Sequence, residues 1–308
     1  MLEIKELTKQ YGQVYAVDRF NLSVERGQIV GLIGANGSGK TTLLEMIAGL
    51  QKSTSGSIVI DGIDAQKFSK ELKSLIGYLP ETLGVYDDLR IDEYLKFFAR
   101  AFKIPSGSQK KLIDQTLDTL HLLDQRKAYV SSLSKGMQQR LSLARTLLHD
   151  PDFLLLDNPT NGLDQKSRME FLELVKELQA KGKTIVIASH ILSELSEICT
   201  DIAIVSQGKL VLQGNIETLI SQHKQNKIVQ IKPLDEPEKT IAFLEEQNQV
   251  CDVKLLSDFI EFEFLGEAEE LSHLLRAILR ASLPITYFKE IDPTLEDVYE
   301  KAVGGITS

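Results

Sequence analysis

GANGSGKT, at residues 34–41, has the spacing of a phosphate-binding P-loop and follows directly on an apolar run at residues 29–33. Glycines in such a loop let the backbone turn tightly, so that successive N–H groups point toward an anion at the positive end of the next helix. We expect Lys40 to reach the β- and γ-phosphates and Thr41 to offer its hydroxyl to Mg²⁺. The sequence therefore predicts a nucleoside triphosphate site built from Gly34, Asn36, Gly37, Ser38, Gly39, Lys40, Thr41 and Thr42.

Apolar runs of the β type alternate with helical patterns along the first 220 residues, which is typical of a parallel sheet covered by helices. The runs lie at residues 28–33, 153–156, 184–188 and 202–205. Gly34, Asp157 and His190 each follow one of them, and the carboxyl ends of parallel strands share one sheet edge. We therefore expect an α/β fold in which these three residues meet. A P-loop alone does not separate kinases, GTPases, helicases and transport ATPases.

The composition, 43% hydrophobic and 26% charged, is that of an ordinary soluble protein. No apolar stretch approaches the roughly 20 residues that cross a bilayer. Residues 1–12 alternate apolar and polar like an edge strand and lack the layout of a signal peptide. Cys199 and Cys251 fit no metal or redox spacing. We expect a cytoplasmic protein whose association with the inner face of the cell membrane would come through a partner.

Acidic residues are concentrated near the C-terminus. Residues 221–308 hold 17 Asp and Glu against 9 Lys and Arg, whereas the whole chain holds 44 against 35. Such a surface repels phosphate backbones, so no nucleic acid partner is expected. A polar stretch at 221–227 reads as a linker, and the β-α-β-β-α-β pattern beyond it predicts a small α+β module of ferredoxin-like type. We predict two domains, 1–220, with an inserted helical subdomain at about 84–150, and 221–308.

Two further motifs accompany the P-loop. FLLLDNPTNGLD, residues 153–164, is an apolar strand that delivers Asp157 to the sheet edge, where a carboxylate can hold Mg²⁺. LSKGMQQR, residues 133–140, introduces a helical run. Together with the P-loop and with His190 in IVIASH, they resemble the motifs of ATP-binding-cassette (ABC) ATPases, in that family's order and over residues 1 to about 220.

The resemblance implies a site shared between two subunits. In this family two nucleotide-binding domains enclose two ATP molecules, each lying between the P-loop of one domain and the signature motif of the other. Ser134 and Gly136 would bind the γ-phosphate of a nucleotide held by a second subunit, in a homodimer or a heterodimer, and Asp164 would touch that subunit. His190 matches the switch histidine that contacts the γ-phosphate. Tyr11 matches the aromatic residue that stacks on adenine, or it is an edge-strand tyrosine without that role.

Several positions depart from the family pattern. Glu81, in IGYLPE, replaces the glutamine that senses Mg²⁺, although a carboxylate can still ligate this cation. Lys135 and Met137 replace a glycine and a glutamine of the common signature. Asn158 replaces the glutamate that polarises the attacking water, and an amide takes no proton at neutral pH. The resemblance implies ATP and Mg²⁺ as cofactors, with hydrolysis slowed; whether Asn158 is natural or engineered stays open. The candidate catalytic residues are Asn158, His190 and Glu81, and the candidate metal ligands are Thr41, Asp157 and Glu81.

The segment DPTLEDVYEKAVG, residues 292–304, resembles the C-terminal end of the ATPase subunits of bacterial exporters for drugs, antibiotics, lipids or polysaccharides. By that resemblance, residues 83–89 would contact a helix of a separate transmembrane permease. A regulatory ATP clamp, with this chain as the weak half of a heterodimer, is the alternative that Asn158 leaves open. A non-transport ATPase of translation or repair is a further alternative, although tandem cassettes and a coiled coil are missing. The transported substrate and its direction are not readable from the sequence.

Overall fold

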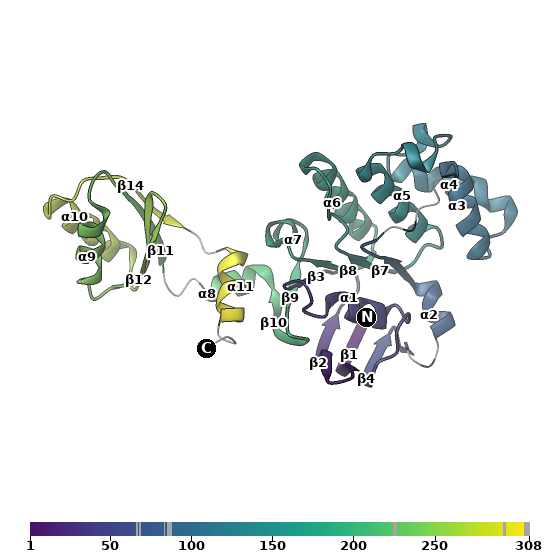
Figure 1. Ribbon diagram of the computed structural model, residues 1–308, viewed down its shortest axis with the longest axis horizontal. Helices are drawn as coiled ribbons and strands as arrows, with labels where there is room; N and C mark the ends of the chain where they lie inside the picture. The colour runs from purple at the N-terminus through teal and green to yellow at the C-terminus, as the bar shows by residue number, and fades with distance from the viewer. Residues whose placement is uncertain are drawn as a thin grey trace. The chain divides into compact units, whose positions relative to one another are not determined.

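The computed structural model describes residues 1–65, 67, 69–82, 84, 88–223, 227–291 and 294–304. The chain divides into two compact units, Met1–Ile216 and Glu217–Gly304 (Figure 1). The division falls at helix α8 (Ile216–His223), whereas the sequence pattern predicted a linker from residue 221. The helix includes residues 221–223 of this polar stretch because Ile216 and Leu219 bury an apolar face. Among the described residues, every helix is too short or too polar to span a bilayer.

A six-stranded sheet forms the centre of the first unit. Its strands are β3 (Ile29–Ile33), β6 (Ile76–Leu79), β7 (Phe153–Asp157), β8 (Thr184–Ser189), β9 (Asp201–Ser206) and β10 (Lys209–Asn215). Their order is β10-β9-β3-β8-β7-β6, and all neighbours are parallel except β10, which is antiparallel to β9. Every residue of β3, β7 and β8 is buried, as in strands covered on both faces. The predicted α/β fold is confirmed.

A second sheet is antiparallel, with the order β2-β1-β4-β5. Its strands are β1 (Leu2–Tyr11), β2 (Val14–Val24), β4 (Ser55–Ile60) and β5 (Ile63–Asp64). Helix α1 (Lys40–Ile47) lies between the two sheets (Figure 1), and its Leu43 and Leu44 join one buried core with residues of both. Strand β1 pairs with β2 and with β4, so the prediction of an edge strand at residues 1–12 is wrong. Alternation reports one buried face and does not report whether the strand edges are paired.

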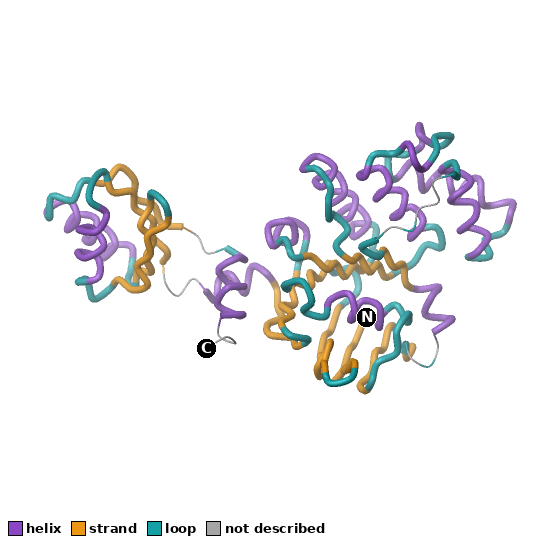
Figure 2. Tube along the Cα trace, viewed as in Figure 1, coloured by secondary structure: helices purple, strands orange, loops and turns teal. Residues whose placement is uncertain are grey.

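Helices cover the other face of the parallel sheet (Figure 2). Helix α6 (Gln165–Ala180) joins β7 to β8, and α7 (Leu192–Ile198) joins β8 to β9. Helix α2 (Ser69–Leu75) precedes β6. The described part of the segment between β6 and β7 is helical, with α3 (Ile91–Ala101), α4 (Ser106–Thr119), α5 (Lys135–Leu147) and the 3₁₀ turns η1 (Leu123–Gln125) and η2 (Val130–Ser132). The motif at 133–140 therefore lies at the start of α5. The motif at 153–164 lies on the next element, β7, and in the loop that follows it.

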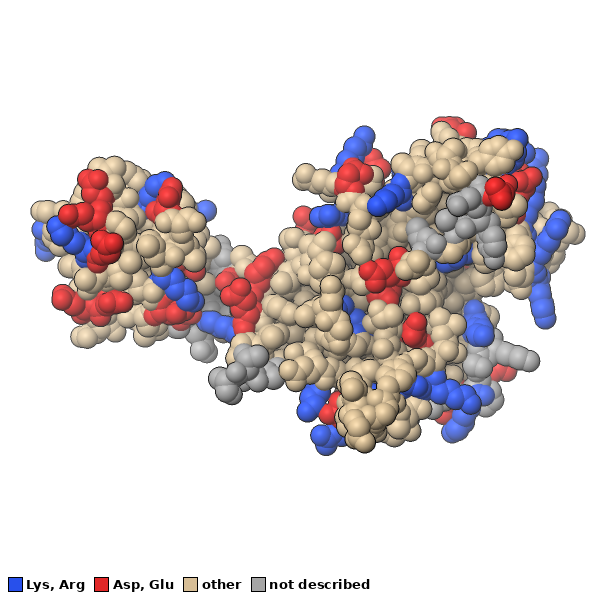
Figure 3. Space-filling model, viewed as in Figure 1, with Lys and Arg blue, Asp and Glu red and all other residues tan. Residues whose placement is uncertain are grey.

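The second unit is a four-stranded antiparallel sheet with helices between its strands. In chain order its elements are β11 (Lys227–Pro233), α9 (Pro237–Glu245), β12 (Val250–Leu256), β13 (Phe259–Phe264), α10 (Ala268–Arg280), β14 (Ile285–Ile291) and α11 (Leu295–Gly304), and the strand order is β12-β13-β11-β14. Ile260, Phe262 and Phe264 alternate along β13 and pack with Leu274 and Ile278 of α10. This unit therefore has a core of its own. Acidic and basic side chains are interspersed on its visible face (Figure 3).

Candidate nucleotide-binding site

The loop between β3 and α1 requires glycine at several positions. Gly37 and Gly39 have φ angles of 79° and 105°, which disfavour other residues. A Cβ on Gly39 would lie 2.2 Å from the carbonyl oxygen of Ala16, and a Cβ on Gly34 would lie 2.2 Å from that of Val205. Because Gly39 is also the N-cap of α1, the backbone enters the helix with its N–H groups exposed to the loop. This is the local geometry that binds an anion.

The ammonium group of Lys40 lies against the loop itself. Its Nζ donates to the carbonyl oxygens of Gly34 at 2.7 Å and Ala35 at 3.0 Å, and lies 3.4 Å from Ser38 Oγ. The residue is only 5% exposed, and burial lowers the pKa of Lys40, opposed by the charges of Asp157 and Glu81. A phosphate oxygen can replace the carbonyl acceptors and would favour the charged ammonium.

A cavity of about 330 Å³ adjoins this loop and gathers most of the predicted residues. Ala16 of β2 also lines the cavity, although the sequence motifs did not predict it. Gly34 and Ser38 lie beneath the cavity, where they contact Lys40. The lining residues are Ala16, Asn36, Gly37, Gly39, Lys40, Thr41, Thr42, Glu81 and Asn158.

Asp157, at the end of β7, is suited to hold a cation. Its side chain is fully buried, and Oδ2 has no hydrogen-bond partner among the described residues. Burial raises the pKa of Asp157, and a hydrogen bond with Thr41 opposes that shift. No cluster of three or more His, Cys, Asp or Glu suited to a metal occurs in the described ranges. Mg²⁺ characteristically takes one or two carboxylates together with substrate phosphates, which fits Thr41 and the free oxygen of Asp157.

Asn158 directs its amide nitrogen toward two carboxylates. Its Nδ2 lies 3.4 Å from Glu81 Oε2 and 3.4 Å from Asp157 Oδ1, and its Oδ1 is buried without a hydrogen-bond partner in the described structure. The φ angle is 42°, which asparagine tolerates better than most residues, and the backbone N–H donates to Ala188 O at 2.9 Å. The carbonyl oxygen is thus an acceptor without a partner among the described residues, and a small rotation of the side chain would be needed to present it to a water.

Glu81 is held by a second amide that the sequence analysis missed. Asn161 Nδ2 donates to Glu81 Oε1 at 2.7 Å, so one carboxylate bridges Asn158 and Asn161. The partners are far apart in sequence, and no local pattern marks the pair. The result is a carboxylate that faces the cavity.

His190 follows β8, between the strands that carry the P-loop and Asp157. Ile191 N–H donates to Ser189 Oγ at 3.0 Å and fixes the turn that carries the histidine. The ring is exposed and does not line the cavity. The sheet order β3-β8-β7 therefore brings His190 to the same edge as Gly34 and Asp157, as predicted.

The remaining predicted residues do not line the cavity. Ser134 is the N-cap of α5 and accepts from Met137 N–H at 3.3 Å. A Cβ on Gly136 would lie 2.7 Å from Ser167 Oγ, so this glycine permits close contact with α6. Asp164 caps α6 and accepts from Ser167 N–H at 3.2 Å. Tyr11 is half exposed, with Lys9 Nζ 5.0 Å from its ring centroid.

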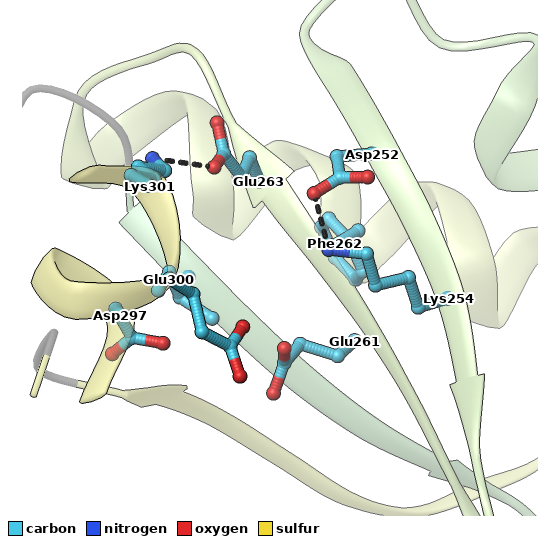
Figure 4. A pocket seen from close by; sticks show the side chains of 9 residues that line it. Asp252, Lys254, Glu261, Phe262, Glu263, Asp297, Glu300 and Lys301 are labelled. Carbon is cyan, nitrogen blue, oxygen red and sulfur yellow. Dashed lines mark hydrogen bonds and ion pairs between the residues drawn. The ribbon is translucent and has the colours of Figure 1, made fainter. Parts of the chain in front are cut away.

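A separate cavity of about 260 Å³ lies in the second unit, between the sheet and α11 (Figure 4). Lys301 pairs with Glu263 at 2.9 Å, and Lys254 pairs with Asp252 at 2.6 Å. Figure 4 shows the carboxylate of Glu300 turned toward the acidic sheet face. Because carboxylates outnumber lysines here, this cavity does not suit a nucleotide. The ion pair of Lys301 with Glu263 joins α11 to β13, whereas Lys254 and Asp252 both lie on β12.

Comparison with known proteins agrees with this geometry. Residues 17–161 match the model of the family described as "ABC transporter". The bacitracin transport ATP-binding protein BcrA of Bacillus licheniformis is 34% identical over an alignment of 310 positions that covers 100% of this chain and 98% of that protein.

Two solved structures share the fold of most of the chain. A subunit of the ABC transporter complex cbiONQ of Clostridium perfringens is 27% identical, with a TM-score of 0.67 over 72% of this chain and 91% of that one. An ATP-binding cassette in a dimeric, post-hydrolysis state bound to ADP and Pi is 28% identical, with a TM-score of 0.63 over 70% of this chain and 98% of that one.

Proposed function

The chain belongs to the ATP-binding proteins of ABC transporters, and from this premise we propose that it powers an exporter of antibiotics or other drugs. The observation that carries the proposal is the cavity in which Lys40, Thr41 and Asn158 meet, beside a buried Asp157 with a free oxygen. The relationship to a bacitracin transport protein over the whole chain favours a peptide antibiotic as cargo.

ATP would bind with its phosphates on the loop at residues 34–41. Lys40 would exchange its carbonyl acceptors for phosphate oxygens, and Thr41 with Asp157 would hold Mg²⁺. When bound, this ion neutralises charge on the β- and γ-phosphates. The exposed ring of Tyr11 is the proposed platform for adenine.

Hydrolysis would be slow because of Asn158. Its free Oδ1 can accept a hydrogen bond from the attacking water and orient it, but the amide takes no proton. General-base catalysis commonly contributes ~10² to 10⁴ in rate, whereas positioning and charge stabilisation remain available to this site. His190 would donate to the γ-phosphate from the end of β8, and Glu81 would contact Mg²⁺ or the water from the other side.

A second subunit would complete the site. Ser134 and Gly136 lie outside the P-loop cavity of their own chain, at the N-terminus of α5, where backbone N–H groups and the helix dipole favour an anion. We assign them to the nucleotide of the partner, with Asp164 at the same interface. The dimeric cassette bound to ADP and Pi supports this arrangement by similarity.

A permease helix would dock in an apolar cavity of about 340 Å³ beside α3. Phe102 stacks on His149 there at a centroid distance of 4.3 Å, and Arg145 lies over Phe98 at 5.3 Å. The sequence predicted residues 83–89 as the contact; most of that segment lies outside the described residues, and none of it is among the residues that line this cavity. Docking would place the protein at the membrane. The lining residues are Ala48, Leu50, Lys73, Ile76, Tyr78, Phe98, Phe102, Arg145, Thr146 and His149.

The domain assignment follows from these roles. We propose that residues 1–220 are the nucleotide-binding domain, with the helices between β6 and β7 as its inserted subdomain. The strand order β12-β13-β11-β14 supports a ferredoxin-like module in residues 221–308.

Two measurements test the proposal. The purified protein should bind ATP with Mg²⁺, form a dimer on size exclusion and hydrolyse ATP well below one turnover per second without a partner. It should co-purify with a membrane protein encoded next to it. A fast isolated ATPase would exclude the role given to Asn158, and a monomer at saturating ATP would exclude the shared site.

A regulatory ATP clamp is the second candidate, because Asn158 lacks a proton-accepting group. In that case this chain would be the weak half of a heterodimer whose partner supplies a catalytic glutamate. Mixing it with a second cassette encoded nearby should then raise the ATPase rate, whereas a homodimeric exporter subunit would respond only to its permease.

A further inference from the structure

Glu194 is a carboxylate buried among three segments of the first unit. The residue is 5% exposed and Thr160 is 2% exposed. Thr160 Oγ1 donates to Glu194 Oε2 at 2.6 Å, and Arg168 Nε lies 2.9 Å from Glu194 Oε1. A buried carboxylate is tolerated when it is paired and hydrogen-bonded, so Glu194 holds the segments of Thr160 and Arg168 in a fixed relation to α7.

Each of these segments leads to a residue of the nucleotide site. Glu194 lies in the first turn of α7, directly after the turn that carries His190. Thr160 lies in the loop that begins at Asn158 and whose Asn161 binds Glu81. Arg168 lies in the first turn of α6. The carboxylate therefore links the histidine turn to the loop that carries Asn158.

The first turn of α6 extends the link toward α5. Ser167 Oγ donates to Asp164 Oδ1 at 2.6 Å, and this same oxygen lies so close to Gly136 that an added Cβ would come within 2.7 Å of it. Glu194 is thus connected, through Arg168 and the start of α6, to the residues that we assign to the nucleotide of the second subunit. A shift of α6 against α5 would be passed to His190.

We propose that Glu194 is a positioning residue for ATP hydrolysis, which sets the place of His190 according to the state of α6 and of the loop at residues 158–164. The inference rests on the proposed function, because it assumes hydrolysis at the P-loop. It adds a role for three residues, Glu194, Thr160 and Arg168, that are not among the residues lining the cavity.

The test is Glu194→Gln, which keeps the size of the side chain and an acceptor for Thr160 but removes the charge that pairs with Arg168. Glu197→Gln, an exposed change on the same helix, is the matched control. We expect Glu194→Gln to slow single-turnover hydrolysis about 10- to 100-fold. ATP affinity, measured in EDTA so that no hydrolysis occurs, should stay within twofold of wild type, and Glu197→Gln should leave both unchanged.

Arg168→Met and the double variant distinguish positioning from a general loss of structure. If the two side chains act through each other, the double variant should hydrolyse ATP as slowly as the slower single variant. The inference would be overturned if the effects of the two substitutions on the rate added in the double variant. It would also be overturned if Glu194→Gln lost as much ATP affinity as hydrolysis rate, or if its rate stayed within twofold of wild type. If Glu194→Gln does not fold, Thr160→Val tests the same link without removing a charge, and a wild-type rate in that variant overturns it too. A wild-type chain that binds no ATP would instead refute the proposed function.

Discussion

Asn158→Glu changes the residue that most clearly separates this chain from its family. The new carboxylate would occupy the place of an amide whose Nδ2 lies 3.4 Å from Glu81 and 3.4 Å from Asp157. It would supply a proton acceptor for the attacking water, and it would also lose two attractive contacts and gain two repulsive ones. Whether hydrolysis rises depends on the size of each effect.

The gain should exceed the cost. General-base catalysis worth ~10² to 10⁴ in rate corresponds to about 3 to 5 kcal/mol. Two unit charges at the 3.4 Å separation from Glu81 repel by about 1 kcal/mol in water and about 5 kcal/mol at an effective dielectric constant of 20. Glu81 is exposed, so screening favours the lower value. Asp157 is fully buried, so its repulsion is small only when Mg²⁺ is bound there and neutralises its charge, as it would be during hydrolysis. The φ of 42° costs a glutamate about 1 kcal/mol more. With Mg²⁺ bound and about 2 kcal/mol lost, hydrolysis should still rise about 5- to 150-fold.

Single-turnover release of phosphate at saturating Mg²⁺·ATP measures this change. Asn158→Gln is the matched control, because it has the length of glutamate but no basic group. The reasoning is refuted if Asn158→Glu hydrolyses ATP at the wild-type rate, or if Asn158→Gln is as fast as Asn158→Glu. In the second case position rather than proton transfer would limit the reaction.

Three further predictions concern other parts of the first unit. Ser134→Ala, which removes an N-cap, should cost about 1 kcal/mol of stability and shift the ATP-bound dimer toward monomer on size exclusion, with unchanged ATP binding by the monomer. Glu81→Gln should raise the Mg²⁺ concentration for half-maximal ATPase activity about tenfold, and an unchanged value would exclude Glu81 as a ligand. Burial opposes ionisation of Asp92, but Lys127 and Lys96 outweigh it and lower the pKa of its carboxyl. The pKa of Asp92 is thus lower in the folded state than in the unfolded state. Ionised Asp92 therefore stabilises the fold at neutral pH, and this contribution is lost as the pH falls through the lowered pKa. Urea denaturation should show Asp92→Asn less stable than wild type by about 1 to 3 kcal/mol at pH 7, converging in acid, whereas the exposed Asp124→Asn should differ at neither pH.

Much of the fold and of the phosphate loop could be predicted from local patterns. Gly37 and Gly39 have the positive φ angles that their positions in the loop require, and Asp157 ends a fully buried strand. Residues 1–12 were misjudged because alternation does not distinguish an edge strand from the interior strand β1. The polar residues 221–223 were predicted as linker, whereas they end α8 because its apolar side chains are buried.

The missed side chains have partners that lie far away in sequence. Asn161 binds Glu81 across 80 residues, and Thr160 binds Glu194 across 34. No periodicity or turn pattern reports such a pair, because it forms only when the sheet has brought β6, β7 and β8 together. Glu194 in particular reads as an ordinary helix-surface acid in a short polar helix.

The sequence by itself determined that a phosphate-binding loop follows a buried parallel strand. It also determined that the residue after Asp157 carries an amide instead of a carboxylate. Turn chemistry, strand hydrophobicity and the identity of a side chain are local properties, and they survive in the unfolded chain. Only the tertiary structure decided that Asn158 and Asn161 both hold Glu81, that Lys40 is buried on its own loop, and that Glu194 of α7 pairs with Arg168 of α6. Burial and charge pairing depend on which distant segments pack together, and that is settled only when the sheet and its helices have formed.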